Sequence, residues 1–172
     1  MKRDAIGFDR DLELAWLEAT AARVAEGNSP AQVREFLWKL LEGKVAGDAP
    51  RSGRGKTATV LLHIWSDVPD EVVPLRDDCL QALTRLSGEQ QLVAHWTMAM
   101  ATYPFFVEVV SALGRLLALQ ETVALNQVTR RIAEKWGERS TAVRACRRVV
   151  RSIVRWGALR DTSKPGVYAR RT

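Results

Sequence analysis

Cysteine and histidine are both scarce in this chain. Its 172 residues include two cysteines and two histidines. Cys79 and Cys146 lie far apart in the sequence, and neither His63 nor His95 belongs to a zinc-binding pattern. This composition excludes a disulfide framework and fits a reduced, cytoplasmic setting. The first residues also lack the apolar core of a signal peptide. We expect no metal and no cofactor.

Long apolar runs are absent as well. The richest stretch, from Leu92 to Leu119, is interrupted by His95, Glu108 and Arg115, and Pro104 divides it. A membrane-spanning helix needs ~20 continuous apolar residues. The sequence therefore predicts two buried helices that meet at the proline, and no membrane association.

Catalytic motifs are missing, although one segment resembles the end of a phosphate-binding loop. Gly53-Arg54-Gly55-Lys56-Thr57 has the final residues of that motif, but Pro50 stands where its first glycine is required. A basic loop is the simpler interpretation, with Arg51, Arg54 and Lys56 as a second phosphate contact. No nucleophile can be paired with a base elsewhere in the sequence. We therefore expect a non-enzymatic protein.

Charge is distributed very unevenly along the chain. Residues 1–125 contain 13 basic and 17 acidic side chains, whereas residues 126–172 contain 13 basic and 3 acidic ones. The net charge of +6 is thus an acidic body joined to a strongly basic end. Such an asymmetry favours a negatively charged partner. The alternative is a solvated basic surface, or one that pairs with the acidic N-terminal part.

Apolar spacing and turn residues predict helices along most of the body. Ser29 and Pro30 provide an N-cap and a first-turn proline for the second of these helices, whereas the third can also be interpreted as a short strand. We expect helices at about 9–25, 29–43, 57–65, 74–86, 89–103 and 104–120, with a loop at 46–55.

The basic end changes character. A short helix is expected from Asn126 to Trp136, followed by a tight turn at Glu138-Arg139-Ser140 and a longer helix to about Trp156. Two short strands, at 159–160 and 167–169, can then form a hairpin around turn residues 162–166. Helix, turn, helix and hairpin follow each other in the order of a winged helix.

The longer of these helices has two distinct faces. At about 100° per residue, its arginines fall on one side, and Cys146 lies with Val149, Val150, Ile153 and Val154 on the other. Arginine suits phosphate groups and guanine edges because its planar guanidinium donates hydrogen bonds in pairs. The arginines of this face are Arg144, Arg147, Arg148, Arg151 and Arg155. The flanking candidates are Arg130, Arg131, Lys164, Arg170 and Arg171.

Several segments follow one another in a characteristic order between roughly residue 16 and residue 159. These are Gly55-Lys56-Thr57 before the block Thr59–Trp65, Tyr103-Pro104-Phe105-Phe106, Ser140-Thr141, Arg147-Arg148-Val149-Val150 and Trp156-Gly157-Ala158-Leu159. In this order the chain resembles the BrxA family, small helical proteins of BREX bacteriophage-exclusion systems with a NusB-like fold. The resemblance implies a DNA-binding accessory role in phage defence, with other proteins of the defence assembly as partners.

Together these patterns predict an all-α helical bundle with a C-terminal winged-helix-like unit that ends in a short β-hairpin. An acidic helical body would cover residues 1–122, and a basic nucleic-acid-binding part would cover residues 123–172. The expected partner is duplex DNA. Two alternatives stay open: RNA binding in the manner of NusB, since arginine-rich helices also serve RNA, and a protein-interaction scaffold without nucleic acid.

Overall fold

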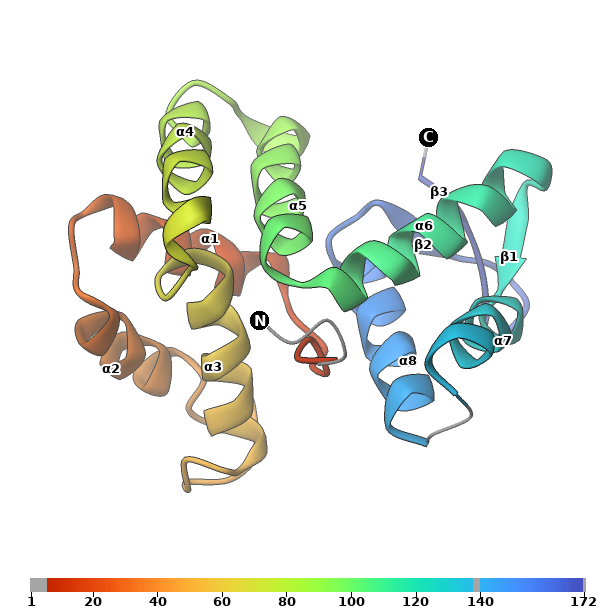
Figure 1. Ribbon diagram of the computed structural model, residues 1–172, viewed down its shortest axis with the longest axis horizontal. Helices are drawn as coiled ribbons and strands as arrows, with labels where there is room; N and C mark the ends of the chain where they lie inside the picture. Colours follow the sequence, from red (N-terminus) through yellow and green to blue (C-terminus); the bar gives the residue numbers. More distant parts are fainter. Residues whose placement is uncertain (1–5, 138–139, 172) are drawn as a thin grey trace. The chain divides into compact units, whose positions relative to one another are not determined.

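The computed structural model describes residues 6–137 and 140–171 of the chain. Over this range the protein is mostly helical, with eight α-helices and three short strands (Figure 1). A mainly helical protein with a C-terminal hairpin was expected, and this part of the prediction is confirmed. The turn predicted at Glu138 and Arg139 lies outside the described residues.

Two compact units make up the chain. The central unit comprises Leu14–Tyr103, and the terminal unit comprises the segment up to Glu13 together with the chain from Pro104 onward. This division differs from the boundary predicted at residue 122, which followed the change in net charge. Apolar packing decides which segments form a compact unit, and it assigns both the N-terminal segment and the helix after Pro104 to the basic end.

The central unit is a bundle of five α-helices. Its elements are α1 (Leu14–Ala25), α2 (Pro30–Leu40), α3 (Gly53–Trp65), the 3₁₀ turn η1 (Asp70–Val72), α4 (Val73–Leu83), the 3₁₀ turn η2 (Gly88–Gln90) and α5 (Gln91–Thr102). The predicted N-cap of α2 is confirmed: Gln32 N donates to Ser29 Oγ, and Ser29 N donates to Gln32 Oε1. The core of this unit includes Leu37, Leu61 and Trp65, all fully buried.

Helix α3 begins earlier than the sequence predicted. It starts at Gly53, inside the expected loop, because Ser52 accepts a hydrogen bond from Gly55 N and caps the first turn. The segment that could have been a short strand is helical. Nine of the thirteen residues of α3 are buried, which explains why its periodicity is hard to recognise from sequence.

The terminal unit places a small antiparallel sheet beside three helices. Its elements are α6 (Pro104–Leu119), β1 (Thr122–Ala124), α7 (Leu125–Trp136), α8 (Ser140–Arg155), β2 (Leu159–Asp161) and β3 (Val167–Arg170). The strand order is β1-β3-β2, with Val123 opposite Tyr168 and Arg160 opposite Ala169. Both hairpin strands lie where they were predicted, whereas β1 was not expected.

Residues 8–13, which we call the acidic strap, run along α8 without forming a helix. Phe8 is fully buried, and its ring centroid lies 5.3 Å from that of Phe106 and 6.3 Å from that of Trp156. Leu12 N donates to Ser152 Oγ, and Trp156 Nε1 donates to Leu12 O, both at 2.9 Å. These contacts compete with local helix formation, so α1 begins at Leu14 rather than near Asp9.

None of the helices within residues 6–137 and 140–171 is, by itself, long and apolar enough to cross a membrane. The stretches η2–α5 and α6 have the required length and composition only when they are taken together across the break at Tyr103. Much of this apolar surface is buried inside the protein, through residues such as Met98, Phe105 and Leu113.

Candidate nucleic-acid interface

Helix α8 presents the two faces that its sequence predicted. Cys146, Val149, Val150 and Ile153 are buried against the rest of the terminal unit. The opposite face carries arginines. Arg144, Arg147, Arg151 and Arg155 are exposed, and Arg148 is half-buried. The strong periodicity of these sixteen residues thus allowed both the helix and its exposed face to be predicted.

Acidic side chains neutralise part of this arginine face. A guanidinium nitrogen of Arg148 lies 3.6 Å from an Asp9 carboxylate oxygen, and Arg155 Nε lies 3.1 Å from Asp11. Arg155 also contacts the carboxylate of Glu13. A third arginine of this face is paired by the hairpin, since Arg151 Nη1 lies 3.2 Å from Asp161. Three of the five predicted arginines therefore have acidic partners.

The first two arginines of α8 differ from the others. Neither Arg144 nor Arg147 lies within ion-pair distance of a carboxylate among the described residues, and both side chains are exposed. Arg144 Nε donates to Ser140 O at 3.3 Å, which is a contact within its own helix. On the arginine face of α8, the positive charge available to an external anion is thus concentrated in the N-terminal half of the helix.

An open hollow of about 390 Å³ adjoins Arg147. It is lined by the N-terminal end of α7, including Asn126 and Thr129, and by Pro165 and Gly166 at the tip of the hairpin. Leu125 N donates to Gly166 O at 2.8 Å and holds the hairpin tip against the start of α7. Among the described residues, none of those that line the hollow is acidic, and a helix N-terminus carries a partial positive charge. The hollow is therefore electropositive.

The flanking candidates do not gather at one place. Arg130 pairs with Glu134 at 3.4 Å, whereas Arg131 has no ion pair to a described carboxylate. Lys164 is exposed in the hairpin turn, and it directly precedes Pro165, which lines the hollow beside Arg147.

The candidates at the end of the chain lie elsewhere. Arg170 donates to Leu117 O and lines a second hollow, of about 530 Å³, with Arg160 and the end of α6. Arg171 is exposed at the end of the described chain.

The segment that resembles a phosphate loop has a structural role. A side chain at Gly55 would lie 2.1 Å from Pro50 O, so glycine is required for this close backbone approach. Arg54 is buried, its guanidinium lies 4.3 Å from the centre of the Trp38 ring, and its Nε donates to Trp38 O at 2.8 Å. Arg54 is thus unavailable as the second phosphate contact suggested above, whereas Arg51 and Lys56 remain exposed.

The remaining candidates for chemistry are buried or dispersed. His95 is 1% exposed, and burial lowers its pKa to about 4. Its ring packs edge-on against that of Trp65, with the centroids 5.3 Å apart. Within residues 6–137 and 140–171, no three His, Cys, Asp or Glu side chains come together as a metal site.

Cys146 is fully buried on the apolar face of α8, and burial raises the pKa of its thiol to about 12. We expect Cys146→Ala to lower the free energy of unfolding by about 1 kcal/mol, because it leaves only a small cavity. Chemical denaturation checks this value. Native Cys146 should also resist a thiol reagent that labels it quickly after unfolding, and rapid labelling of the folded protein would contradict this burial.

Sequence reasoning missed the acidic strap as a part of this surface. Asp9, Asp11 and Glu13 lie about 140 residues from the arginines that they meet, and the local pattern there resembles the start of a helix. The only signal in the sequence was the general possibility that basic and acidic parts pair. Burial raises the pKa of Asp11, although Arg155 lowers it, which reflects how closely the strap packs on α8.

Comparisons of the chain with protein-family models, with curated proteins and with solved structures found no match.

Proposed function

We propose that the terminal unit binds duplex DNA without catalysing a reaction, and that it does so as a winged-helix-like unit. The order α6, β1, α7, α8, β2, β3 supports this proposal, since two helices are followed by a hairpin. The pairing of β1 with β3 ties the hairpin to the start of α7. In this arrangement α8 is the helix that enters a groove, and the β2–β3 hairpin contacts the neighbouring backbone.

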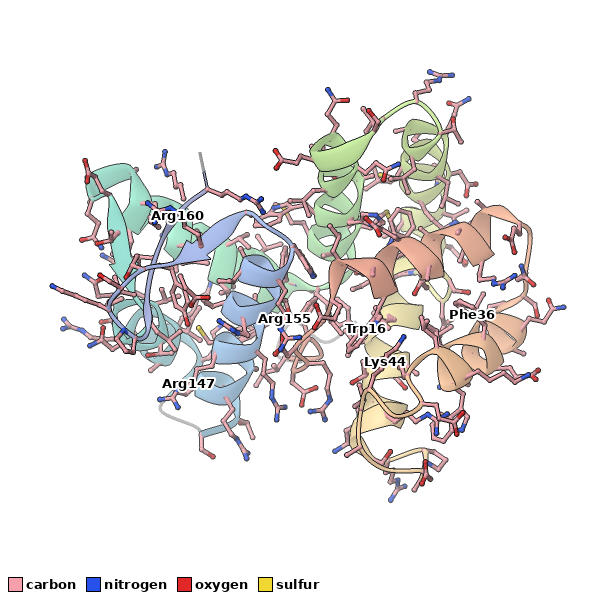
Figure 2. All side chains as sticks on the ribbon, turned by 180° about the vertical axis from the view of Figure 1, so that it is seen from behind. Trp16, Phe36, Lys44, Arg147, Arg155 and Arg160 are labelled. Carbon is pink, nitrogen blue, oxygen red and sulfur yellow. The ribbon has the colours of Figure 1, made fainter. Side chains whose placement is uncertain are left out.

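The observation that carries the proposal is the pair Arg144 and Arg147. Both are exposed in the N-terminal half of α8, and neither has a described acidic partner. Arg147, which is labelled in Figure 2, also borders the hollow that the hairpin tip lines. A helix that enters a groove N-terminal end first brings such residues near base edges and near the phosphates that flank the groove, while the hairpin lies close to the neighbouring backbone. Lys164 is the hairpin cation in this model.

Binding should be electrostatic and strongly dependent on salt. If Arg144, Arg147 and Lys164 neutralise ~3 phosphates, log affinity falls with log salt concentration at a slope of roughly −3. Fluorescence anisotropy of a labelled duplex, titrated across a salt series, measures this slope. Absence of binding at low salt would contradict the proposal.

The same assay distinguishes the alternatives. Unlabelled duplex DNA, structured RNA and a neutral protein are added in turn as competitors. We expect duplex DNA to compete best, because in the proposed arrangement α8 enters a B-form groove and the hairpin contacts its backbone. Stronger competition by RNA would favour a NusB-like role, and a protein that competes when neither nucleic acid does would favour a scaffold.

The BrxA resemblance adds a cellular role to the proposal. It assigns the chain a cytoplasmic accessory role in a phage-defence assembly of the BREX type, with other proteins of that assembly as partners. The sequence segments that carry the resemblance support this assignment. A methyltransferase gene and a phosphatase-like gene beside the coding sequence would agree with it, and a locus without defence genes would contradict it.

A further inference from the structure

The acidic strap is fixed to one half of α8. Its apolar side chains Phe8 and Leu12 are both fully buried. Its backbone is held by the hydrogen bonds between Leu12 and the side chains of Ser152 and Trp156, each 2.9 Å long. Because these anchors are buried, the strap is part of the folded surface rather than a loosely attached segment.

The strap brings its carboxylates to the C-terminal half of the arginine face. Asp9 meets Arg148, whose Nη1 also donates to Asp9 O at 2.6 Å, and Asp11 and Glu13 both meet Arg155. These side chains remain 33–43% exposed, so they lie at the surface that an approaching polyanion would meet. A phosphate near Arg155 would therefore also face two carboxylates.

Distance along the helix separates Arg155 and its two carboxylate partners from the free arginines. Arg147 and Arg155 are eight residues apart, which corresponds to about 12 Å along an α-helix. The Debye length is about 8 Å at physiological ionic strength. Asp11 and Glu13 thus act strongly on a phosphate near Arg155, whereas their effect on a phosphate near Arg144 or Arg147 is largely screened. Arg148 follows Arg147 directly, so Asp9 is separated from Arg147 by the turn of about 100° per residue around the helix and not by distance along it.

From these contacts we infer that the acidic strap limits the nucleic-acid footprint on α8. The backbone of the bound polyanion is met by Arg144, Arg147 and the hairpin, and Arg148 and Arg155 are withheld from it by Asp9, Asp11 and Glu13. This inference rests on the proposed nucleic-acid binding and specifies which part of the surface performs it. It also removes Arg148 and Arg155 from the set of DNA-contacting arginines that the sequence predicted.

Neutralising the strap tests the inference. The variant Asp9→Asn/Asp11→Asn/Glu13→Gln removes the acidic partners of Arg148 and Arg155 on α8, and of Arg10 in the strap, whose side chain is only 14% exposed. The two arginines of α8 become available, so the slope of log affinity against log salt should steepen by about 2 and binding to a labelled DNA duplex should tighten. Partly exposed ion pairs contribute little to stability, so the variant should still fold, as circular dichroism will show. The matched control is Asp67→Asn/Asp70→Asn/Glu71→Gln in the central unit, whose three carboxylates are exposed. It changes net charge equally and should keep the wild-type slope.

A second measurement uses single arginine substitutions in the wild-type background and in the neutralised background. In the wild-type background Arg155→Ala should leave the salt slope unchanged, whereas Arg147→Ala should reduce it by about one. In the neutralised background both substitutions should reduce it.

The possible results distinguish a failure of the strap inference from a failure of the proposed DNA binding. If wild-type protein binds DNA but the neutralised strap gives the same slope, or if Arg155→Ala reduces the wild-type slope, the inference is overturned and the proposed function stands. If neither protein binds DNA at low salt, the proposed function fails.

Discussion

The double variant Arg144→Ala/Arg147→Ala is expected to bind duplex DNA about a hundredfold more weakly than the wild type at about 0.1 M salt. Each substitution removes a contact of about 1–3 kcal/mol if it reaches a base edge, and about one unit of salt slope if it reaches a phosphate. Stability should hardly change, because both side chains are exposed, lack a described carboxylate partner and are replaced by the strongest helix former. Fluorescence anisotropy measures the affinity and thermal unfolding measures the stability.

Arg51→Ala/Arg85→Ala is the matched control for this variant. It removes the same charge from exposed positions in the central unit, so it should bind almost as well as the wild type. Equal losses for the two double variants would show that binding depends on net charge alone. That result would contradict a localised site on α8.

Acid should destabilise the protein through His95. Burial lowers the pKa of its imidazole from 6.5 to about 4 in the folded state. Below pH 6.5 the unfolded chain binds a proton at this position that the folded protein does not. The free energy of unfolding should therefore fall by about 3 kcal/mol as the pH decreases from 7 to 4, and this contribution should be constant above pH 7.

Comparison of His95→Leu with the wild type isolates this effect. Neither ring nitrogen of His95 has a hydrogen-bond partner among the described residues, so an apolar side chain of similar size is tolerated there. Denaturant unfolding at pH 7, 5 and 4, followed by tryptophan fluorescence, should show a smaller acid dependence in His95→Leu. His63→Gln, at a less buried histidine, should retain the full dependence. Identical acid dependence in the wild type and His95→Leu would contradict this assignment.

Local periodicity explains what could be predicted from the sequence. The faces of α8 follow from sixteen residues with a regular pattern, and the cap of α2 follows from adjacent residues. The hairpin strands follow from a cluster of turn residues between them. Each of these features depends on interactions between near neighbours, which the order of amino acids displays directly.

Long-range contacts explain what could not be predicted. Strand β1 has three residues and exists because it pairs with β3, more than forty positions later. The strap is held by Ser152 and Trp156, and these contacts override the helical pattern of residues 9–13. The candidate site was therefore predicted as a continuous arginine face, whereas the folded surface is divided by acidic residues from the other end of the chain.

We propose that DNA contacts the N-terminal half of α8 and the hairpin. The most direct test is an NMR titration of the labelled protein with a short DNA duplex, following each backbone amide. We expect the largest chemical-shift changes around Arg144 and Arg147, at the first turn of α7 and at residues 162–167. Small changes at these positions together with large changes confined to the central unit would contradict the claim.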